Sequence, residues 1–510
     1  MRKTALTFEL PNTLSPEQFV SHTANHLQMQ ITDQYSAVKS FYDSFDWRLY
    51  HAGMFCEFNQ SEHHSQLSLQ NITHPQVLMS MEIAEVPRFA HDFTRHDFRQ
   101  QLDLLLEMRA LLKIATLNYQ HTQLNVLNSD QKTILRLSLE DFTDLPARVT
   151  VQLIKGYDKS VLPILNLLQS DLGLIPISQS LLLDLLKKQG KTAGTYSSKL
   201  NIALDPDMHA DIACKYIYSH LLKSMQLNEQ GCIEQLDSEF LHDFRVAVRR
   251  TRAGLSQIKQ VLPRESLARF ADFFNWLGQI TSPVRDIDVY LLNFQAFKQS
   301  LPISIREDLN PLRDYLRAKQ QTAYQQLSAQ LQSPRYTDTL AEWQTYLHEP
   351  TPKKTQEAFT KMPIKQLADY RIWRVYKRLL REAQIIDNQS AANTLHSLRK
   401  TAKKLRYLIE FFQQLYPEMD IKNLLKSLKS LQEVLGDFQD YEVQELALKQ
   451  FSTELKDQGV PVATFLAMGV LIQILDTRKL KAREAFAIRF EQFKHPKNQH
   501  IFRDLFAPSK

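Results

Sequence analysis

Glycine and cysteine are scarce in this chain: 11 of its 510 residues are glycine and three are cysteine. Little glycine, together with abundant leucine, glutamine, lysine, arginine, glutamate and alanine, favours helices over a loop-rich or all-β architecture. The cysteines form no CxxC pair, and their odd number argues against a disulfide framework and favours a reducing compartment. They are Cys56, Cys214 and Cys232.

Long apolar runs are also missing. The sequence contains no stretch of about 18 uncharged apolar residues, so it predicts no transmembrane helix. The first residues, MRKTALTFELPNTL, lack the apolar core of a signal peptide. We therefore expect a cytoplasmic protein without a membrane partner. The formal net charge of +6 suggests an anionic partner but does not identify one.

The length predicts two or three domains, and the first of them, residues 1–190, has an α+β pattern. Short alternating runs predict strands, and apolar stripes predict helices over 15–29 and 97–113. The expected strands cover 5–10, 66–70, 123–126, 134–139 and 148–154. The polar stretch 191–205 is the expected linker.

Strand signals disappear after the linker, and residues 206–500 are predicted to form an all-α domain of two repeated helical bundles. A polar break at 333–360 is expected to separate the two repeat units, which cover about 206–332 and 361–491. The helices predicted within these units include 265–280, 284–300, 420–437 and 439–456.

The two units are inferred from an internal repeat with an offset of 154 residues. The segment LHDFRVAVRRTRAGL (241–255) aligns with LHSLRKTAKKLRYLI (395–409), and the same offset carries Asp286 onto Asp440. A charge pattern and a distant aspartate at one offset indicate a duplicated unit, with the two copies related by an approximate two-fold axis.

Each copy carries a basic stripe, led by a histidine, beside its apolar stripe. The stripe recurs at i, i+3, i+7 and i+10, which spans roughly 15 Å of helix. Like charges at such spacings repel by a few tenths of a kcal/mol per pair, yet no acidic residue lies between Asp243 and Glu265 or between Asp387 and Glu410. We interpret the stripes as a site for an external anion. Their members are His242, Arg245, Arg249 and Arg252, then His396, Arg399, Lys403 and Arg406, widened by Arg250, Lys400 and Lys404.

The histidines and the two aspartates leave roles open. Each histidine suits a core hydrogen bond, a phosphate donor or a general acid. Neighbouring arginines are expected to lower the histidine pKa and a bound polyanion to raise it again, so binding should strengthen as the pH falls toward 6. Asp286 and Asp440 are predicted at helix starts, where they would cap or orient a neighbour rather than catalyse. Further basic rows are predicted as additional phosphate contacts, although solvated faces or internal salt bridges fit them equally well. These are Arg371, Arg374, Arg378, Arg478 and Lys479.

The motifs HDFRVAVRRTR with RDIDV, and LHSLRKTAKKLRYLIEFF with LQEVLGDFQD, resemble the CHAD family over about 205–500. The resemblance implies two helical bundles around a basic groove that binds inorganic polyphosphate. One departure is Thr281-Ser282, where the second copy has Leu435-Gly436, and it is expected to affect a bundle contact more than the groove. Carried over residue by residue, the resemblance assigns the groove to the eleven histidines, arginines and lysines of the two stripes.

The segment KSFYDSFDWRLYHAGMFCEF (39–58) resembles the CYTH domain of triphosphate tunnel metalloenzymes. Their hallmark is an ExExK strand whose alternation points three side chains inward. Here the matching positions hold Lys3, Ala5 and Thr7, a late strand offers Thr150 and Gln152, and Gln70 replaces a usual lysine. We therefore expect a degenerate, non-catalytic barrel without a cofactor, where Mg²⁺ or Mn²⁺ would matter only if it were active. The remaining carboxylates are expected at the surface: Glu9, Glu57, Glu82, Glu140 and Asp141.

Three functions follow from these patterns. The first is polyphosphate binding without catalysis, with association to polyphosphate granules. The second is a metal-dependent inorganic triphosphatase or polyphosphatase that uses the N-terminal domain. The third is nucleic-acid binding, which is disfavoured because only Phe244 and Tyr407 interleave with the basic stripes as stacking platforms. The sequence does not predict the oligomeric state.

Overall fold

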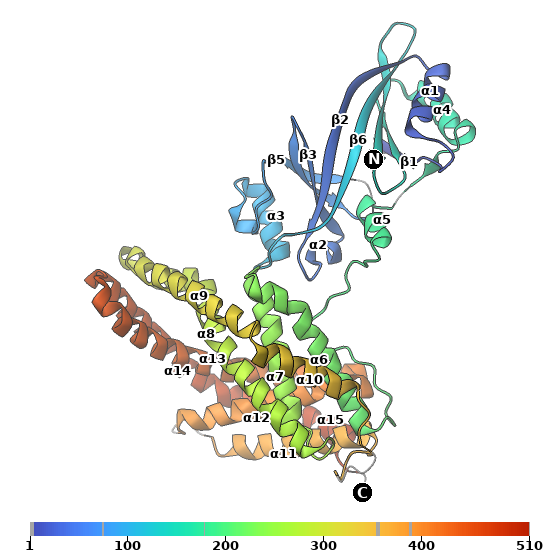
Figure 1. Ribbon diagram of the computed structural model, residues 1–510. Coiled ribbons are helices and arrows are strands. Elements are labelled where there is room, and N and C mark those ends of the chain that lie inside the picture. Colours follow the sequence, from blue (N-terminus) through green and yellow to red (C-terminus); the bar gives the residue numbers. More distant parts are fainter. Residues whose placement is uncertain (1–4, 74–75, 178, 353–356, 387–389, 509–510) are drawn as a thin grey trace. The chain divides into compact units, whose positions relative to one another are not determined.

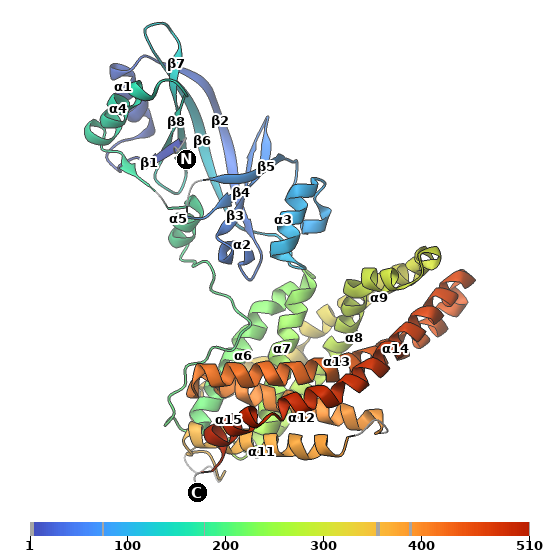
Figure 2. The same cartoon turned by 180° about the vertical axis from the view of Figure 1, so that it is seen from behind.

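The computed structural model describes residues 5–73, 76–177, 179–352, 357–386 and 390–508 (Figures 1 and 2). The chain divides into two compact units, Met1–Ser197 and Ser198–Lys510. The first is an α+β unit and the second is helical, so the predicted fold class is confirmed. No described helix has an apolar window long enough to cross a membrane. The three cysteines are buried free thiols.

The first unit is built on a nine-stranded antiparallel sheet in the order β5-β4-β3-β2-β6-β7-β8-β1-β9. Two long central strands, β2 and β6, pair along almost their whole length. The strands are β1 (Ala5–Glu9), β2 (Met29–Asp43), β3 (Met54–Ser61), β4 (Ser65–Asn71), β5 (Val77–Glu82), β6 (Leu112–Leu127), β7 (Thr133–Phe142), β8 (Arg148–Leu153) and β9 (Ile175–Pro176).

Period-two alternation gives this sheet two different faces. In β7, Leu135, Leu137 and Leu139 are buried in one apolar core, together with Val149 and Val151 of β8. The residues between them, such as Glu140 and Thr150, lie on the opposite face and line a cavity. Five helices accompany the sheet: α1 (Pro16–His26), α2 (Arg48–His51), α3 (His96–Leu106), α4 (Asp158–Asn166) and α5 (Leu181–Lys188).

The strands predicted at 5–10, 66–70, 134–139 and 148–154 match β1, β4, β7 and β8. The prediction at 123–126 covers only the end of β6. The helix predicted over 97–113 was too long, because α3 ends at Leu106 and Glu107 adopts a positive φ of 51°. A residue with positive φ cannot continue a right-handed helix, so α3 stops there and the chain turns toward β6.

The second unit repeats a set of five helices. The first copy consists of α6 (Ala210–Ile233), α7 (Ser238–Gln257), α8 (Arg264–Ser300), α9 (Asn310–Leu331) and α10 (Pro334–His348). The second consists of α11 (Ile364–Gln384), α12 (Ala392–Phe412), α13 (Glu418–Leu455), α14 (Val462–Phe493) and α15 (Pro496–Phe506). The first three helices of each copy begin 154 residues apart, which is the offset of the sequence repeat.

Two predicted helix boundaries were wrong. The pairs 265–280/284–300 and 420–437/439–456 are single helices, α8 and α13, and α8 continues through Pro283. The polar break at 333–360 contains α10, because Tyr336, Leu340, Trp343 and Leu347 give it a buried apolar stripe. Each copy therefore gains a fifth helix beyond the predicted units.

The two copies share one apolar core. Residues of α8 and α9 pack with residues of α13 and α14 in a single cluster that includes Phe294, Leu316, Phe451 and Leu471. Tyr290 Oη also donates a hydrogen bond to the carbonyl of Gln444 at 2.5 Å. Helix α7 of the first copy packs against α12 of the second. The basic stripes on these two helices are therefore held on one rigid body.

Candidate anion-binding sites

The basic stripes of α7 and α12 meet where the two helices pack together. Arg249 of α7 lowers the pKa of Arg245 on its own helix and the pKa of Lys403 on α12. Arg399 also acts on Lys403. These four residues form a continuous patch of positive charge, which we call the basic row: Arg245, Arg249, Arg399 and Lys403.

Arg245 is positioned by neutral groups. Its Nη1 donates to Thr281 Oγ1 at 2.7 Å and its Nη2 to Ser282 Oγ at 3.1 Å, both on α8. Burial, followed by repulsion from Arg249, lowers its pKa to about 10. The Thr281-Ser282 departure was expected to bear on a bundle contact more than on the basic stripe. The structure corrects this, because the two hydroxyls hold the guanidinium of Arg245 without supplying a negative charge.

Lys403 has the most perturbed charge in the row. Burial and repulsion from Arg399 and Arg249 lower its pKa to about 7, despite the opposing attraction of Asp440. At neutral pH the ammonium is therefore only partly protonated in the free protein. Such a group takes up a proton when an anion approaches, since the anion favours its charged form.

The aspartates orient basic side chains but do not cap helices. Asp440 forms an ion pair with Arg399 at 3.1 Å. Asp286 interacts electrostatically with Arg245. Both lie in the middle of long helices, α8 and α13, so the prediction that they stand near helix starts was wrong. His396 contacts Gln439 through Nδ1, and His242 is partly buried.

Not all residues of the stripes belong to the row. Arg250 and Arg406 both bind the carboxylate of Glu410, at 3.1 and 3.3 Å, and Arg250 also donates to the carbonyl of Ser198 at 2.8 Å. Arg252 donates to Asn275 Oδ1 at 2.9 Å. Glu410 thus offsets part of the positive charge of Arg250 and Arg406 within the protein.

The predicted additional contacts separate into two places. Lys479 lies on α14, where it pairs with Glu445 at 2.6 Å and Asp476 at 2.8 Å. Its neighbour Arg478 is partly buried on the same helix. Arg371, Arg374 and Arg378 instead line a cavity of about 390 Å³ on α11, together with Lys404. Lys400 is exposed on α12.

The N-terminal unit has its own polar cavity, of about 250 Å³, on the inner face of the sheet. Thr7, Gln70 and Thr150 line it, whereas Gln152, which was expected beside Thr150, is exposed. Lys3 lies outside the described residues. Glu57 and Glu140 also line the cavity, so their expected surface position was wrong.

A buried lysine forms ion pairs with both of these carboxylates. Lys39 Nζ lies 2.6 Å from Glu140 and 3.8 Å from Glu57. Burial disfavours the ammonium, but Glu140 and Glu57 outweigh it and raise the pKa of Lys39. Among the described residues, no three histidine, cysteine or acidic side chains converge as metal ligands. A divalent cation would have to displace Lys39, so these residues do not fit a metal.

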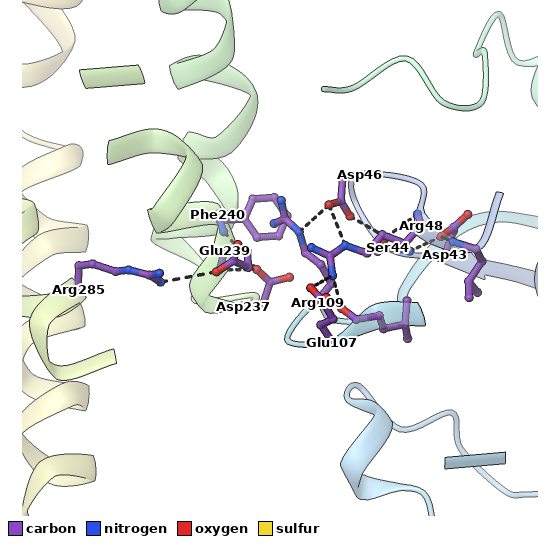
Figure 3. Close-up of polar contacts among 12 residues, drawn as sticks. Asp43, Ser44, Asp46, Arg48, Glu107, Arg109, Asp237, Glu239, Phe240 and Arg285 are labelled. Atoms are coloured by element: carbon purple, nitrogen blue, oxygen red, sulfur yellow. Dashed lines mark hydrogen bonds and ion pairs between the residues drawn. The ribbon is translucent and has the colours of Figure 1, made fainter. Parts of the chain in front are cut away.

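The tyrosine–aspartate segment at 39–58 has a structural role (Figure 3). The buried carboxylate of Asp43 accepts hydrogen bonds from the backbone of Ser44, Leu49 and Tyr50, at 2.7 to 2.9 Å, and thereby holds α2. Burial raises its pKa to about 6 even though these bonds oppose the shift. Asp46 pairs with Arg48 at 3.0 Å.

Figure 3 also shows how the basic helix of the first copy begins. Asp237 caps α7 by accepting from the backbone N–H groups of Glu239 at 2.9 Å and Phe240 at 3.1 Å. Arg285 of α8 lies 3.7 Å from the carboxylate of Glu239. The cap and the ion pair fix the first turn of α7 against α8, and this sets the rotation of the stripe that follows.

A protein-family model, the CHAD domain, matches residues 217–449. Among solved structures, the CHAD domain from Ricinus communis is 24% identical, covers 62% of this chain and 99% of its own, and has a TM-score of 0.47. PptA from Streptomyces chartreusis is 16% identical, with 55% and 98% covered and a TM-score of 0.44. No curated protein matches the chain.

A third solved structure is similar to a smaller part of the chain. It is a putative adenylyl cyclase from Hippeastrum, described as having a dominant triphosphatase activity. It is 12% identical, with 37% of this chain and 96% of its own covered and a TM-score of 0.27.

Proposed function

Because residues 217–449 of this chain form a CHAD domain, we propose that its basic row binds inorganic polyphosphate and performs no chemistry on it. The observation that carries the proposal is the state of Lys403, whose pKa of about 7 reflects burial and repulsion from its arginine neighbours. Cations on a rigid scaffold repel one another, and a bound anion relieves this repulsion, so such a cluster favours anion binding.

The chemistry of the row suits a phosphate polymer. Arginine offers a planar fork that binds phosphate oxygens with two hydrogen bonds, and lysine adds a point charge. A linear polyphosphate presents no bases, so spacing and charge alone decide its recognition. The row lies on two packed helices of one rigid body, which keeps the spacing of its cations fixed.

The aromatic residues of the stripes argue against nucleic acid. Proteins that bind single strands stack bases on exposed aromatic rings. Phe244 and Tyr407 are the two aromatic residues that interleave with the stripes, and they are 0% and 7% exposed. Both rings pack into the core and offer no stacking platform. This favours a partner that consists of phosphates only.

A titration with long-chain polyphosphate tests the proposal. The variant Arg249→Gln/Lys403→Gln removes two central cations of the row. Its matched control, Lys422→Gln/Lys429→Gln, removes two lysines of α13 whose side chains are 66% and 71% exposed. Each lost phosphate contact should lower the slope of log K against log salt by about 0.7 to 0.9, so the row variant should lose roughly 1.5 and the control almost nothing.

Equal affinity and equal salt slopes in the two variants would refute the proposal. RNA that displaces polyphosphate at the same phosphate concentration would favour the nucleic-acid function instead. Phosphate release in the presence of Mg²⁺ or Mn²⁺ would show that the protein also hydrolyses the polymer. In cells, a fluorescent fusion should follow polyphosphate granules, and the row variant should not.

A further inference from the structure

A second basic site lies on the α11 side of α12. The end of the first-copy helix α7, together with α11 and α12, encloses a cavity of about 390 Å³. In the sequence of α12, Lys403 belongs to the basic row and Lys404 to this cavity. Adjacent residues on a helix point about 100° apart, so the two sites are on different faces of α12. We call this cavity the α11 pocket, and its positive side chains are Lys259, Arg371, Arg374, Arg378, Arg381 and Lys404.

These six cations face a single carboxylate. Glu382 binds Arg378 at 2.5 Å. Within the part of the chain that the structure describes, no carboxylate forms an ion pair with Lys259, Arg374, Arg381 or Lys404. Repulsion therefore dominates, and after burial the positive charge of Arg378 lowers the pKa of Lys404 most.

The base of the pocket is rigid. Arg371 is 6% exposed, and its Nη2 donates to the backbone carbonyl of Lys259. Its guanidinium lies 5.3 Å from the centres of the Phe359 and Tyr370 rings. A buried arginine with a carbonyl and two rings as neighbours keeps its full charge, because none of these groups is anionic. Such an arginine is preorganised for anion binding.

The internal repeat explains why this pocket is open. In the first copy, Arg250 occupies the position of Lys404 and forms an ion pair with Glu410 of the other copy, at 3.1 Å. The residue related to Glu410 by the repeat is Ser256, which lines the α11 pocket beside Lys404. The same crossing of α7 and α12 thus produces one closed ion pair and one open basic pocket.

We propose that the α11 pocket binds a short condensed phosphate, either free or as the end of a longer chain. A cavity of about 390 Å³ is in the range of small-ligand sites, and it limits the occupant to a compact anion. A tripolyphosphate carries roughly four to five negative charges at neutral pH, which balances the surplus of cations. This site is separate from the basic row and does not depend on the function proposed for it.

The repeat also supplies the decisive variant. Ser256→Glu would recreate in the α11 pocket the ion pair that Glu410 forms with Arg250, while Ser256→Gln matches it in size without the charge. In calorimetric titrations of the full chain with tripolyphosphate, in metal-free buffer, wild type and Ser256→Gln should bind alike. Ser256→Glu should bind about tenfold more weakly or worse, since a carboxylate inside an anion site repels the ligand.

Three further arms separate the outcomes. Arg374→Gln/Arg381→Gln should lose tripolyphosphate binding, whereas Arg249→Gln/Lys403→Gln of the basic row should keep it. Long-chain polyphosphate should compete with tripolyphosphate in proportion to the concentration of its chain ends if the pocket binds chain ends. It should not compete if the pocket binds only free short phosphates. Wild type that does not bind tripolyphosphate, or equal affinities of Ser256→Glu and Ser256→Gln with equal thermal stability, would overturn the proposal.

Discussion

Lys403 makes a quantitative prediction about pH. Its pKa is about 7 in the free protein, against an ordinary value of 10.5. A bound polyanion restores the charged form, so between these two values the complex holds up to one more proton than the free components do. The affinity should therefore be nearly constant below pH 7 and fall as the pH rises above it.

The magnitude follows from proton linkage. One linked proton changes the dissociation constant by at most about tenfold per pH unit. The full hundredfold between pH 7 and 9 is an upper bound, because the pKa in the complex need not reach its ordinary value. We expect a loss of about tenfold over this interval.

The assay is fluorescence anisotropy of labelled polyphosphate at pH 6, 7, 8 and 9 and constant ionic strength. The matched variant is Lys403→Arg, which keeps the charge but does not titrate in this range. Its affinity should vary little between pH 7 and 9. Parallel pH profiles for wild type and Lys403→Arg would refute the reasoning, and a rise in affinity confined to pH 7 to 6 would return attention to His242 and His396.

Three other predictions concern stability. Lys403→Met should raise the melting temperature of the helical unit by about 2 to 4 °C at pH 6 to 7, corresponding to about 1 kcal/mol. Because the pKa of Lys403 is lower in the folded than in the unfolded protein, the cost of its charge is fully present below pH 7 and is lost as the pH rises toward 10. The stability gain should therefore fade toward pH 10 in calorimetric scans, and a gain independent of pH would contradict the assignment. Glu410→Gln removes the carboxylate between Arg250 and Arg406 and should destabilise the protein by about 2 kcal/mol in denaturant titrations, whereas the exposed control Glu433→Gln should have no effect. Lys39→Met leaves Glu57 and Glu140 without their shared cation and should destabilise the N-terminal unit by about 3 kcal/mol at pH 8. The loss should be smaller at pH 5, where one of the two carboxyl groups can protonate. Equal losses of stability at pH 8 and pH 5 would show that packing alone is affected.

The duplication could be predicted from the sequence because a repeat preserves its own offset. The helices α6, α7 and α8 begin 154 residues before their counterparts, as the motif alignment requires. Helix α10 could also have been found, since Tyr336, Leu340, Trp343 and Leu347 recur at helical spacing within the polar segment. Its polar composition concealed a narrow apolar stripe.

The strand β2 could not be read from periodicity. Its first residues are exposed on both faces, and its last five, from Lys39 to Asp43, are all buried. Neither half alternates, so the usual signal of a half-buried strand is missing. Burial of Lys39 is likewise invisible in the sequence, because it depends on Glu57 and Glu140 of two other strands.

The candidate sites divide in the same way. Helical spacing was sufficient to identify the basic stripes, because the residues on one face of a helix follow from the local sequence alone. It could not show that Glu410 of one copy neutralises Arg250 of the other, because that contact crosses the repeat. Lys259 was missed for the same reason, as it follows the end of α7 and reaches a pocket on α11.

The differences between the two copies suggest how a duplicated domain acquires two kinds of site. Two pairs of equivalent cations, Arg245 with Arg399 and Arg249 with Lys403, form one row across the α7–α12 contact. Positions at which the copies differ, such as Ser256 and Glu410, decide whether a neighbouring basic cluster is open or closed. A single exchange at that pair changes the charge of a pocket without altering the row. Binding of a long chain and binding of a compact phosphate can therefore vary independently in this fold, and the variants at Ser256 and at Arg249 with Lys403 should separate them.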